Sequence, residues 1–486
     1  MKLSKLKETL MSQLPENMKP IGLGKNGNSS SERVNPKMIM PLSYEEKGSS
    51  NGDTTLYNNE GANLMDDVKI IGIVGSRGKT TTAKIIHEYL IAKGYKSMLY
   101  SSAEIFSPAG TSAPGEGSET PLFSEGSLLR ILVEAEAYQP NFLVLEVNET
   151  SISRGLAKNI PFAAKVLTNI YKNHHSDQES SEEYINTIKT FFKTNDLTTA
   201  VNVFGLTGDL TREEFNELLN LNSNASYTFG SKYIAERRNA NYEALDVLLY
   251  HVLHDMNGLH FEVEIAGKEL AFDTKLLLPH NTLNLTCAIT TLKALGIFEA
   301  NIFSKAIANL KVEGREELFC MKDRKVMVGM FLAPTLEVLA DYRNKGQINK
   351  IRVVTGAPGT GFKGWDPEFM TEFFISQRSK VRKQAMDYAR AFADFVYLTE
   401  NDSGADDPQM ICSELQNYLK GSAAVSEIIV NREEAIRTAI EDCESGDIVF
   451  IAGRGNRNVL VVGENKTKIL KDSEFVKEIL KEASPS

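Results

Sequence analysis

A glycine-rich loop is the stretch of this chain with the clearest chemical potential. Its residues are Gly75, Ser76, Arg77, Gly78, Lys79, Thr80 and Thr81. The β-branched run 68–74 before it predicts a buried strand, and the apolar spacing over 83–92 predicts a helix after it. Loop N–H groups at a helix N-terminus bind phosphate, a loop lysine reaches the terminal phosphates, and the next threonine holds Mg²⁺. We therefore predict a nucleotide-phosphate site, with an ordinary strand–helix turn as the alternative.

A carboxylate follows another apolar run. Residues 142–147 predict a buried strand, and Glu146 lies at its end. In parallel sheets, ligands gather at the carboxyl ends of the strands, which is the edge where Lys79 is expected. We predict that Glu146 binds Mg²⁺ directly or through water. A solvated carboxylate at the edge of the sheet is the alternative.

Two histidines and a lysine follow the strand predicted at 164–170. His174 and His175 lie in a polar loop, and Lys189 lies on the helix predicted at 184–193. Taken alone, such residues are more typical of a loop and a solvated helix face than of a site.

Three more polar residues lie near the ends of predicted elements. Asn281 and Asn284 open the helix predicted at 281–295, where asparagine also serves as a cap. Arg315 closes the first globular unit, and it is either a phosphate ligand or a surface charge.

Strands and helices alternate through most of the chain, which predicts an α/β fold with a doubly wound, mostly parallel sheet. Composition indicates a reduced, partly disordered N-terminal region at 1–66, a central phosphate-loop unit at 67–318 and a smaller Rossmann-like unit at 319–486. Residues 106–126 are predicted to form a loop, and 224–273 to be largely antiparallel.

The bulk composition is that of a globular protein with more than one core. Of the 486 residues, 42% are hydrophobic, and domains usually hold about 100–200 residues. The net charge of −10 argues against a nucleic-acid partner. No run of about 18 apolar residues occurs, so no membrane span is predicted. The four cysteines are scattered without metal-site spacing, which favours a reduced, cytoplasmic protein. The oligomeric state stays open.

Seven stretches, in this order, resemble the Mur ligase family, and within it the UDP-N-acetylmuramoyl-tripeptide synthetases. They are GSRGKTTT (75–82), LEV (145–147), LTNIYKNHH (167–175), HNTLN (280–284), VEGREE (312–317), ADFVYLTENDSGADDP (393–408) and GDIVFIAGRGN (446–456). The resemblance implies domains for a UDP-sugar substrate, for ATP and for an incoming amino acid. It also implies stepwise amide ligation with ATP and Mg²⁺, through an acyl phosphate.

The resemblance implies roles for single residues near the nucleotide. Lys79 and Thr80 would contact the ATP phosphates and Mg²⁺, and Arg315 would contact the phosphates. Glu146 and His174 would bind the same metal ion.

Two further roles come from the same resemblance. Asn281 would lie against the adenine. The family's carbamylated catalytic lysine aligns with Ile188, one position before Lys189, which a loop insertion would bring into place.

The C-terminal unit departs from the family where the amino acid would bind. Asn401 and Asp402 lie in a motif that lacks the arginine which grips a diaminopimelate carboxylate. Gly453 opens a second motif, in which Arg457 stands in the place of an acid and makes the pocket basic. We take these four as substrate residues, and expect small-molecule carboxylate and amino-acid substrates other than diaminopimelate.

Three functions are compatible with this pattern. The first is a divergent ATP-dependent carboxylate–amine ligase, in peptidoglycan or specialised-metabolite biosynthesis. The second is a nucleotide-binding relative with a scaffold or regulatory role, suggested by the residues that differ at Gly329, Leu332, Gly404 and Arg457. The third is a standard tripeptide synthetase, which the short, polar region 1–66 disfavours.

Overall fold

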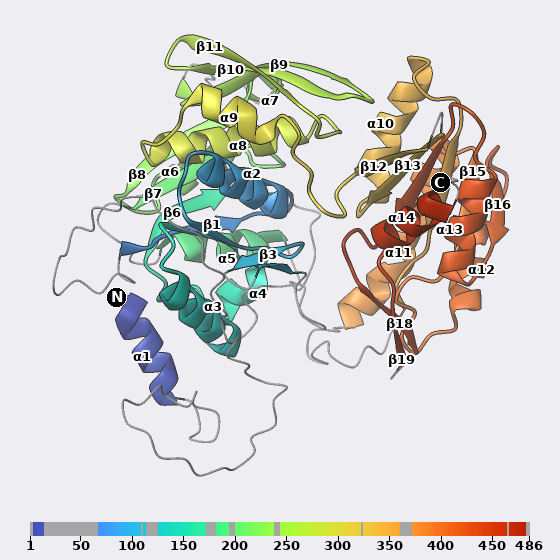
Figure 1. Ribbon diagram of the computed structural model, residues 1–486, viewed down its shortest axis with the longest axis horizontal. Coiled ribbons are helices and arrows are strands. Elements are labelled where there is room, and N and C mark those ends of the chain that lie inside the picture. Colours follow the sequence, from blue (N-terminus) through green and yellow to red (C-terminus); the bar gives the residue numbers. More distant parts are fainter. Residues whose placement is uncertain are drawn as a thin grey trace, which may run out of the picture.

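Two sheets in separate halves of the chain organise the protein (Figure 1). The computed structural model describes residues 3–13, 67–107, 110–112, 125–171, 181–193, 200–237, 244–321, 324–359, 372–463 and 466–482. The larger sheet has eleven strands and the smaller has six. Both are covered by helices, which confirms the predicted α/β class. The prediction for residues 1–66 lies outside the described residues, apart from helix α1 (Leu3–Gln13).

The first half of the chain builds the larger sheet. Its strands are β1 (Lys69–Val74), β2 (Ser97–Tyr100), β3 (Ile105–Ser107), β4 (Gly110–Ser112), β5 (Phe142–Glu146), β6 (Phe162–Leu167), β7 (Val201–Leu206), β8 (Ala225–Ser231), β9 (Val247–Asp255), β10 (Gly258–Ile265) and β11 (Lys268–Thr274). Its helices are α2 (Lys79–Ala92), α3 (Glu125–Tyr138), α4 (Glu149–Ser153), α5 (Ser181–Lys193), α6 (Arg212–Leu219), α7 (Lys232–Arg237), α8 (Asn281–Ala294) and α9 (Ala300–Ile307).

Strand β1 lies within the parallel part of this sheet because it is apolar on both faces. Every residue after Lys69 is buried, as a strand between two helical layers requires. It pairs in parallel with β5 and β6, and parallel pairing continues to β2 on one side and through β7 and β8 to β9 on the other. The carboxyl ends of these strands therefore lie along one edge.

Two of the predicted local patterns hold only in part. The antiparallel pairing predicted within 224–273 is confirmed for β9, β10 and β11. Residues 225–231 are not antiparallel, because β8 continues the parallel series and antiparallel pairing begins only between β9 and β10. Residues 105–112 are not all loop, because β3 and β4 form a short antiparallel pair at the opposite edge. Strands of three residues are too short to give an alternating pattern.

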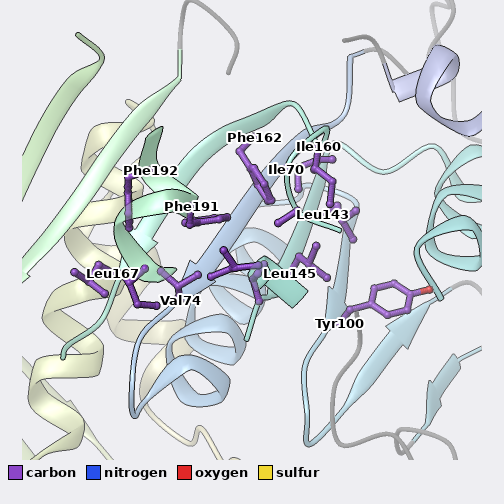
Figure 2. Close-up of a cluster of buried hydrophobic side chains, with 14 of the residues drawn as sticks. Ile70, Val74, Tyr100, Leu143, Leu145, Ile160, Phe162, Leu167, Phe191 and Phe192 are labelled. Carbon is purple, nitrogen blue, oxygen red and sulfur yellow. The ribbon is translucent and has the colours of Figure 1, made fainter. Parts of the chain in front are cut away.

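Each face of the larger sheet has its own apolar core. Figure 2 shows part of one core, where side chains of β1, β5 and β6 meet α5; its labelled residues are Ile70, Val74, Tyr100, Leu143, Leu145, Ile160, Phe162, Leu167, Phe191 and Phe192. Helices α2, α8 and α9 form the core on the other face. Both faces of the sheet are thus fixed, which holds its carboxyl edge in place.

The second half builds the smaller sheet. Its strands are β12 (Glu317–Met321), β13 (Arg324–Gly329), β14 (Ile351–Thr355), β15 (Phe395–Leu398), β16 (Val425–Ile428) and β17 (Ile448–Ala452), with a separate hairpin of β18 (Val459–Gly463) and β19 (Lys466–Ile469). Its helices are α10 (Leu332–Asn344), α11 (Glu372–Phe392), α12 (Pro408–Leu419), α13 (Arg432–Glu441) and α14 (Asp472–Glu482).

All strands of the smaller sheet except β12 run parallel, in the order β12-β13-β17-β14-β15-β16. Helices α10, α11 and α12 pack on one face, and α13 and α14 pack on the other. This sheet begins at Glu317, two residues before the boundary we placed at 318/319. Within the described ranges, no helix combines the length and apolarity that a membrane span needs.

A buried ion pair ties α14 to α13. Arg432 Nη2 lies 2.7 Å from Asp472 Oδ2, and both side chains are fully buried. We predict that Asp472→Ala lowers the free energy of unfolding of this unit by about 3–5 kcal/mol, because the guanidinium stays buried without its partner. Urea unfolding followed by circular dichroism measures the loss.

The control for this prediction is a pair at the surface. Arg437 and Glu482 lie 2.8 Å apart, with side chains 40% and 60% exposed. Glu482→Ala should leave the urea midpoint nearly unchanged, because solvent screens an exposed ion pair. Equal losses in the two variants would contradict a special role for the buried pair.

The junction between the units buries a carboxyl group. Glu316 is 8% exposed, and burial raises its pKa from 4.5 to about 7. The folded state therefore binds this proton more tightly than the unfolded state. Its stabilising contribution is complete below pH 4.5 and is lost as the pH rises towards 7.

We predict that Glu316→Gln flattens this pH dependence. The wild type should lose stability relative to the variant as the pH rises from about 4.5 to 7, in urea titrations at matched pH. Glu337→Gln, on an exposed position of α10, should keep the slope of the wild type. Parallel curves for Glu316→Gln and the wild type would show that Glu316 is ionised normally.

Candidate active site

Two glycines with positive φ shape the phosphate loop. Gly75 has φ 135° and Gly78 has φ 80°, a region that favours glycine. A Cβ atom on Gly78 would lie 2.0 Å from Asn284 Oδ1, and one on Gly75 would lie 2.2 Å from Thr168 Oγ1. The loop is therefore packed closely against α8 and the end of β6.

Lys79 begins helix α2 directly after the loop. Gly78 supplies no side-chain cap, and the first turn, which includes the buried Thr80 and Thr81, carries no acid. The positive end of the helix thus faces the loop without a neutralising side chain of its own. Lys79 Nζ donates to the backbone oxygen of Gly75 at 2.7 Å. The ammonium group stays over the loop, where a lysine contacts bound phosphate.

Residues after β6 hold the loop from the neighbouring strand. Asn169 accepts from the Arg77 N–H at 2.9 Å and donates its own Nδ2 to the Arg77 oxygen at 2.9 Å. Thr168 Oγ1 donates to the same oxygen at 2.7 Å. The N–H of Tyr171 donates to Ser76 Oγ at 2.8 Å. Our motif 167–175 therefore includes the residues that fix the loop conformation.

Thr80 and Glu146 meet although 66 positions separate them. Thr80 Oγ1 donates to Glu146 Oε2 at 3.0 Å, and both side chains are buried. Ser102, which the sequence analysis did not identify, joins them. Its backbone N–H donates to Glu146 Oε2 at 2.8 Å, and its hydroxyl lies 3.0 Å from Thr80 Oγ1. Carboxylate and hydroxyl oxygens are the donors that Mg²⁺ takes, so this cluster fits that ion.

The C-terminal unit contacts this cluster through Asn456. Its Nδ2 donates to the backbone oxygen of Ser102 at 2.9 Å, and its Oδ1 accepts from Arg315 Nη1 at 3.0 Å. Gly314 has φ 63°, and a Cβ atom there would lie 2.1 Å from the Asn456 nitrogen. A chain of contacts thus runs from Glu146 to the loop after β17 and to the junction between the units.

Arg77 makes a second contact between the units. Its Cζ lies 5.2 Å from the ring centroid of Tyr171 and 5.5 Å from that of Phe331, which precedes α10. Cation–π contacts at exposed sites contribute about 0.5–1 kcal/mol each. The contact of Arg77 with a nucleotide stays a prediction.

Asn281 lies beneath the loop. Its side chain is 4% exposed, its Nδ2 donates to the Leu277 oxygen at 2.6 Å, and its Oδ1 accepts from Asn284 at 2.9 Å. Asn284 in turn lies against Gly78. The structure therefore gives Asn281 a supporting position, and its contact with adenine stays a prediction.

Lys189 is not brought to the cluster. Its Nζ donates to Glu217 Oε2 of α6 at 2.7 Å. The residue of α5 that reaches the loop is Tyr184, whose hydroxyl accepts from Ser76 Oγ at 3.0 Å. The structure thus places Lys189 in an ion pair between two helices instead of the predicted catalytic position. His174 lies outside the described residues, as does the histidine after it, so its metal role stays a prediction.

The predicted substrate residues form a charge cluster at the carboxyl ends of β15 and β17. Asp402 accepts from Arg454 Nη1 and from Arg457 Nη1, each at 2.8 Å. Burial alone would raise the pKa of Asp402, but the two guanidinium groups outweigh it and hold this pKa below its usual value. Asp402 thus neutralises only one of the two guanidinium charges, and the basic pocket around Arg457 stays a prediction.

Buried polar atoms lie beside this cluster. In the part of the chain that the structure describes, Asn401 Oδ1 and Ser403 Oγ are buried without a hydrogen-bond partner. Asn401 Nδ2 lies 3.5 Å from the Gly356 oxygen. A Cβ atom on Gly453 would lie 2.9 Å from the same Asn401 Nδ2. A buried polar atom without a partner costs about 1–3 kcal/mol, so a ligand that donates a hydrogen bond here would be bound favourably.

Two family models match the chain in the order of the two units. The Mur ligase middle domain matches residues 73–292, and the Mur ligase glutamate ligase domain matches residues 333–455. The first includes the phosphate loop with Ser102 and Glu146, and the second ends one residue before Asn456.

Named relatives agree with these matches. The UDP-N-acetylmuramoyl-L-alanyl-D-glutamate–2,6-diaminopimelate ligase of Wolinella succinogenes is 27% identical over 420 residues, with 85% of each chain covered. A solved structure of a ligase of that name has a TM-score of 0.57 at 18% identity, covering 86% of this chain and 79% of the other. MurF ligase of Thermotoga maritima, solved with ADP, has a TM-score of 0.57 at 16% identity, covering 86% and 81%. Because both domain models match in order across the two units that build this site, the chain belongs to the Mur ligase family.

Proposed function

We propose that this protein is an ATP-dependent ligase that joins a carboxylate to an amine. The observation that carries the proposal is the cluster of Thr80, Ser102 and Glu146 beside the phosphate loop, linked by Asn456 to the C-terminal unit. A site shared by two units suits a reaction in which a nucleotide and two further substrates must meet. Membership of the Mur ligase family supports the same reaction class.

The central unit would bind the nucleotide. The loop N–H groups and Lys79 would contact the ATP phosphates, and Thr80 and Glu146 would hold Mg²⁺. When bound, Mg²⁺ neutralises negative charge on the phosphates. Arg315, held at the junction between the units by Asn456, would add a further positive charge beside the phosphates.

The proposed reaction has two steps. An oxygen of the substrate carboxylate attacks the γ-phosphorus, the bond to the bridging oxygen breaks, and ADP leaves. The amine then attacks the carbonyl carbon of the acyl phosphate and loses a proton, and inorganic phosphate leaves. The chain's contribution is the positioning of the reactants and the compensation of charge, and no side chain acts as a covalent nucleophile.

We place the amine near Asn401 and Ser403. The partnerless Asn401 oxygen would accept a hydrogen bond from the amine, and the paired charges of Asp402 and Arg457 would border it. Gly404 stands where the resemblance implies an arginine for diaminopimelate, so we propose a different amine. The polar composition of residues 1–66 leads us to propose a carboxylate other than the UDP-linked muramyl peptide.

A nucleotide-binding scaffold is the second candidate. The observation that favours it is the contact of Arg77 with Phe331, because an aromatic ring here stands in the stretch where the resemblance implies an aspartate and a histidine. Such a protein would bind ATP and hold its two units together, but would release little phosphate.

Substrate-dependent release of phosphate distinguishes these candidates. We expect Mg-ATP with a suitable pair from a panel of amino acids, short peptides and UDP-muramyl peptides to yield phosphate and a product whose mass is the sum of both substrates less water. Lys79→Ala should reduce turnover by about 10²–10³-fold or more, because a donor to the transferring phosphate is lost, while circular dichroism stays unchanged.

The outcomes separate the candidates. ATP binding without phosphate release across the panel would favour the scaffold. A product formed only from the UDP-muramyl dipeptide and diaminopimelate would establish the standard tripeptide synthetase. Wild-type turnover by Lys79→Ala would overturn the assignment of the loop.

The link between the units gives a separate prediction. Asn456→Ala removes the hydrogen bonds to Ser102 and Arg315, which together contribute about 1–3 kcal/mol. Loss of that much positioning energy in the transition state would lower turnover about 5–150-fold. ATP affinity should change little, because the phosphate loop stays intact. Asn417→Ala, on an exposed position of α12, is the control. If Asn456→Ala turns over like this control, the contact does not serve catalysis.

A further inference from the structure

A second group of ligand-type side chains lies on the β9–β10 hairpin. His251 comes from β9, and His260 and Glu262 come from β10. One ligand atom from each lies within 4.8 Å of the other two. All three are accessible to solvent, with side chains 46%, 32% and 29% exposed.

A β-bulge brings these side chains together. Glu262 pairs with His251, but Val263 pairs with Leu249, so Tyr250 is an extra residue in β9. Bulges re-aim side chains and occur often beside functional sites. Here the bulge leaves both His251 and Tyr250 beside Glu262, and the Tyr250 side chain forms a hydrogen bond with the Glu262 carboxylate.

The distances within the group fit a metal ion. His251 Nδ1 lies 3.4 Å from Glu262 Oε1, and His260 Nε2 lies 3.5 Å from the same oxygen. Around a tetrahedral ion with bonds of about 2.0–2.1 Å, neighbouring ligand atoms are about 3.3–3.4 Å apart. Two edges of the group therefore already have nearly this length.

The neighbouring strand completes the arrangement. Asp273 of β11 is paired with His260, and its Oδ1 lies 2.9 Å from His260 Nδ1. A carboxylate on one ring nitrogen orients the imidazole and makes the other nitrogen a better metal ligand. His260 Nε2, the nitrogen facing Glu262, is thus the one presented to an ion.

We propose that His251, His260 and Glu262 bind a divalent transition-metal ion of the zinc class, with Asp273 orienting His260. Two imidazoles and one carboxylate form a ligand set suited to Zn²⁺ and leave one position for water. The site is distinct from the phosphate loop, because β8, β7 and β6 lie between β9 and β1, about 19 Å at about 4.8 Å per strand.

The position of the hairpin suggests what the ion does. Next to the group, the end of the hairpin contacts the C-terminal unit: the Met256 N–H donates to Gln347 Oε1 at 3.1 Å, and His254 lies 3.3 Å from the Tyr342 hydroxyl. Figure 1 shows β9 and β10 extending from the edge of the large sheet towards α10. An ion that crosslinks β9 and β10 would stiffen this connection.

The test is a zinc titration of the full chain. The protein is stripped with a chelator and titrated with Zn²⁺ against a chromophoric competitor, with excess Mg²⁺ present to occupy the phosphate-loop cluster. We expect the wild type to bind one equivalent of Zn²⁺. Each of the variants His251→Ala, His260→Ala and Glu262→Gln should bind Zn²⁺ at least tenfold more weakly. Asp273→Asn should weaken binding about 10–100-fold.

His254→Ala is the matched control. His254 is on the same strand but pairs with the buried Leu259, on the other face, so this variant should keep the zinc equivalent. Zinc should also raise the melting temperature of the wild type and of His254→Ala, but not of Glu262→Gln. Anomalous scattering from zinc-soaked crystals should place the ion between the three side chains.

Two results would overturn the proposal. One is a wild type that binds no zinc under these conditions. The other is zinc binding that the His251, His260 and Glu262 substitutions leave unchanged, since the ion would then lie elsewhere. Circular dichroism of each variant shows whether the fold is kept, and the near-isosteric Glu262→Gln preserves the packing of the hairpin.

Discussion

The hydrogen bond between Thr80 and Glu146 depends on the register of two parallel strands, and the site depends on that bond. β1 and β5 pair so that Ile73 lies opposite Glu146, which places the end of β5 beside the loop that follows β1. A slip of one residue would turn Glu146 to the other face of the sheet. The two helical layers oppose such a slip, because both faces of β1 and β5 are buried.

The C-terminal unit contacts the same carboxyl edge of the larger sheet. Its contact with the cluster is made by the loop after β17, and this loop can approach because Gly314 leaves room for the Asn456 backbone. Arg315 follows directly and donates to the Asn456 side chain. The segment that connects the units therefore also shapes the site between them, so the position of one unit and the geometry of the other are not independent.

The sequence was most informative where one local rule decided the structure. Continuous apolar runs predicted β1 and β5 to within one residue at each end, and glycine spacing predicted the loop before α2. Ser102 could not be found this way, because a serine after a strand is common and only the pairing of β2 with β5 brings it to Glu146. Lys189 came from the resemblance, in which the family's lysine aligns with Ile188, and the structure pairs its ammonium group with Glu217.

Two carboxylates that follow strands of the two sheets have different surroundings. Glu146 receives only neutral donors, from Thr80 and Ser102, and has no ion-pair partner among the described residues. Its charge thus remains available to a cation. Asp402 instead pairs with two arginines, so its single negative charge leaves one positive charge in the group. Under the proposed function, the cluster around Glu146 would supply the negative charge that Mg²⁺ requires. The cluster around Asp402 would instead offer guanidinium groups and a neutral amide, which favour recognition of a ligand by hydrogen bonds over attraction of a cation.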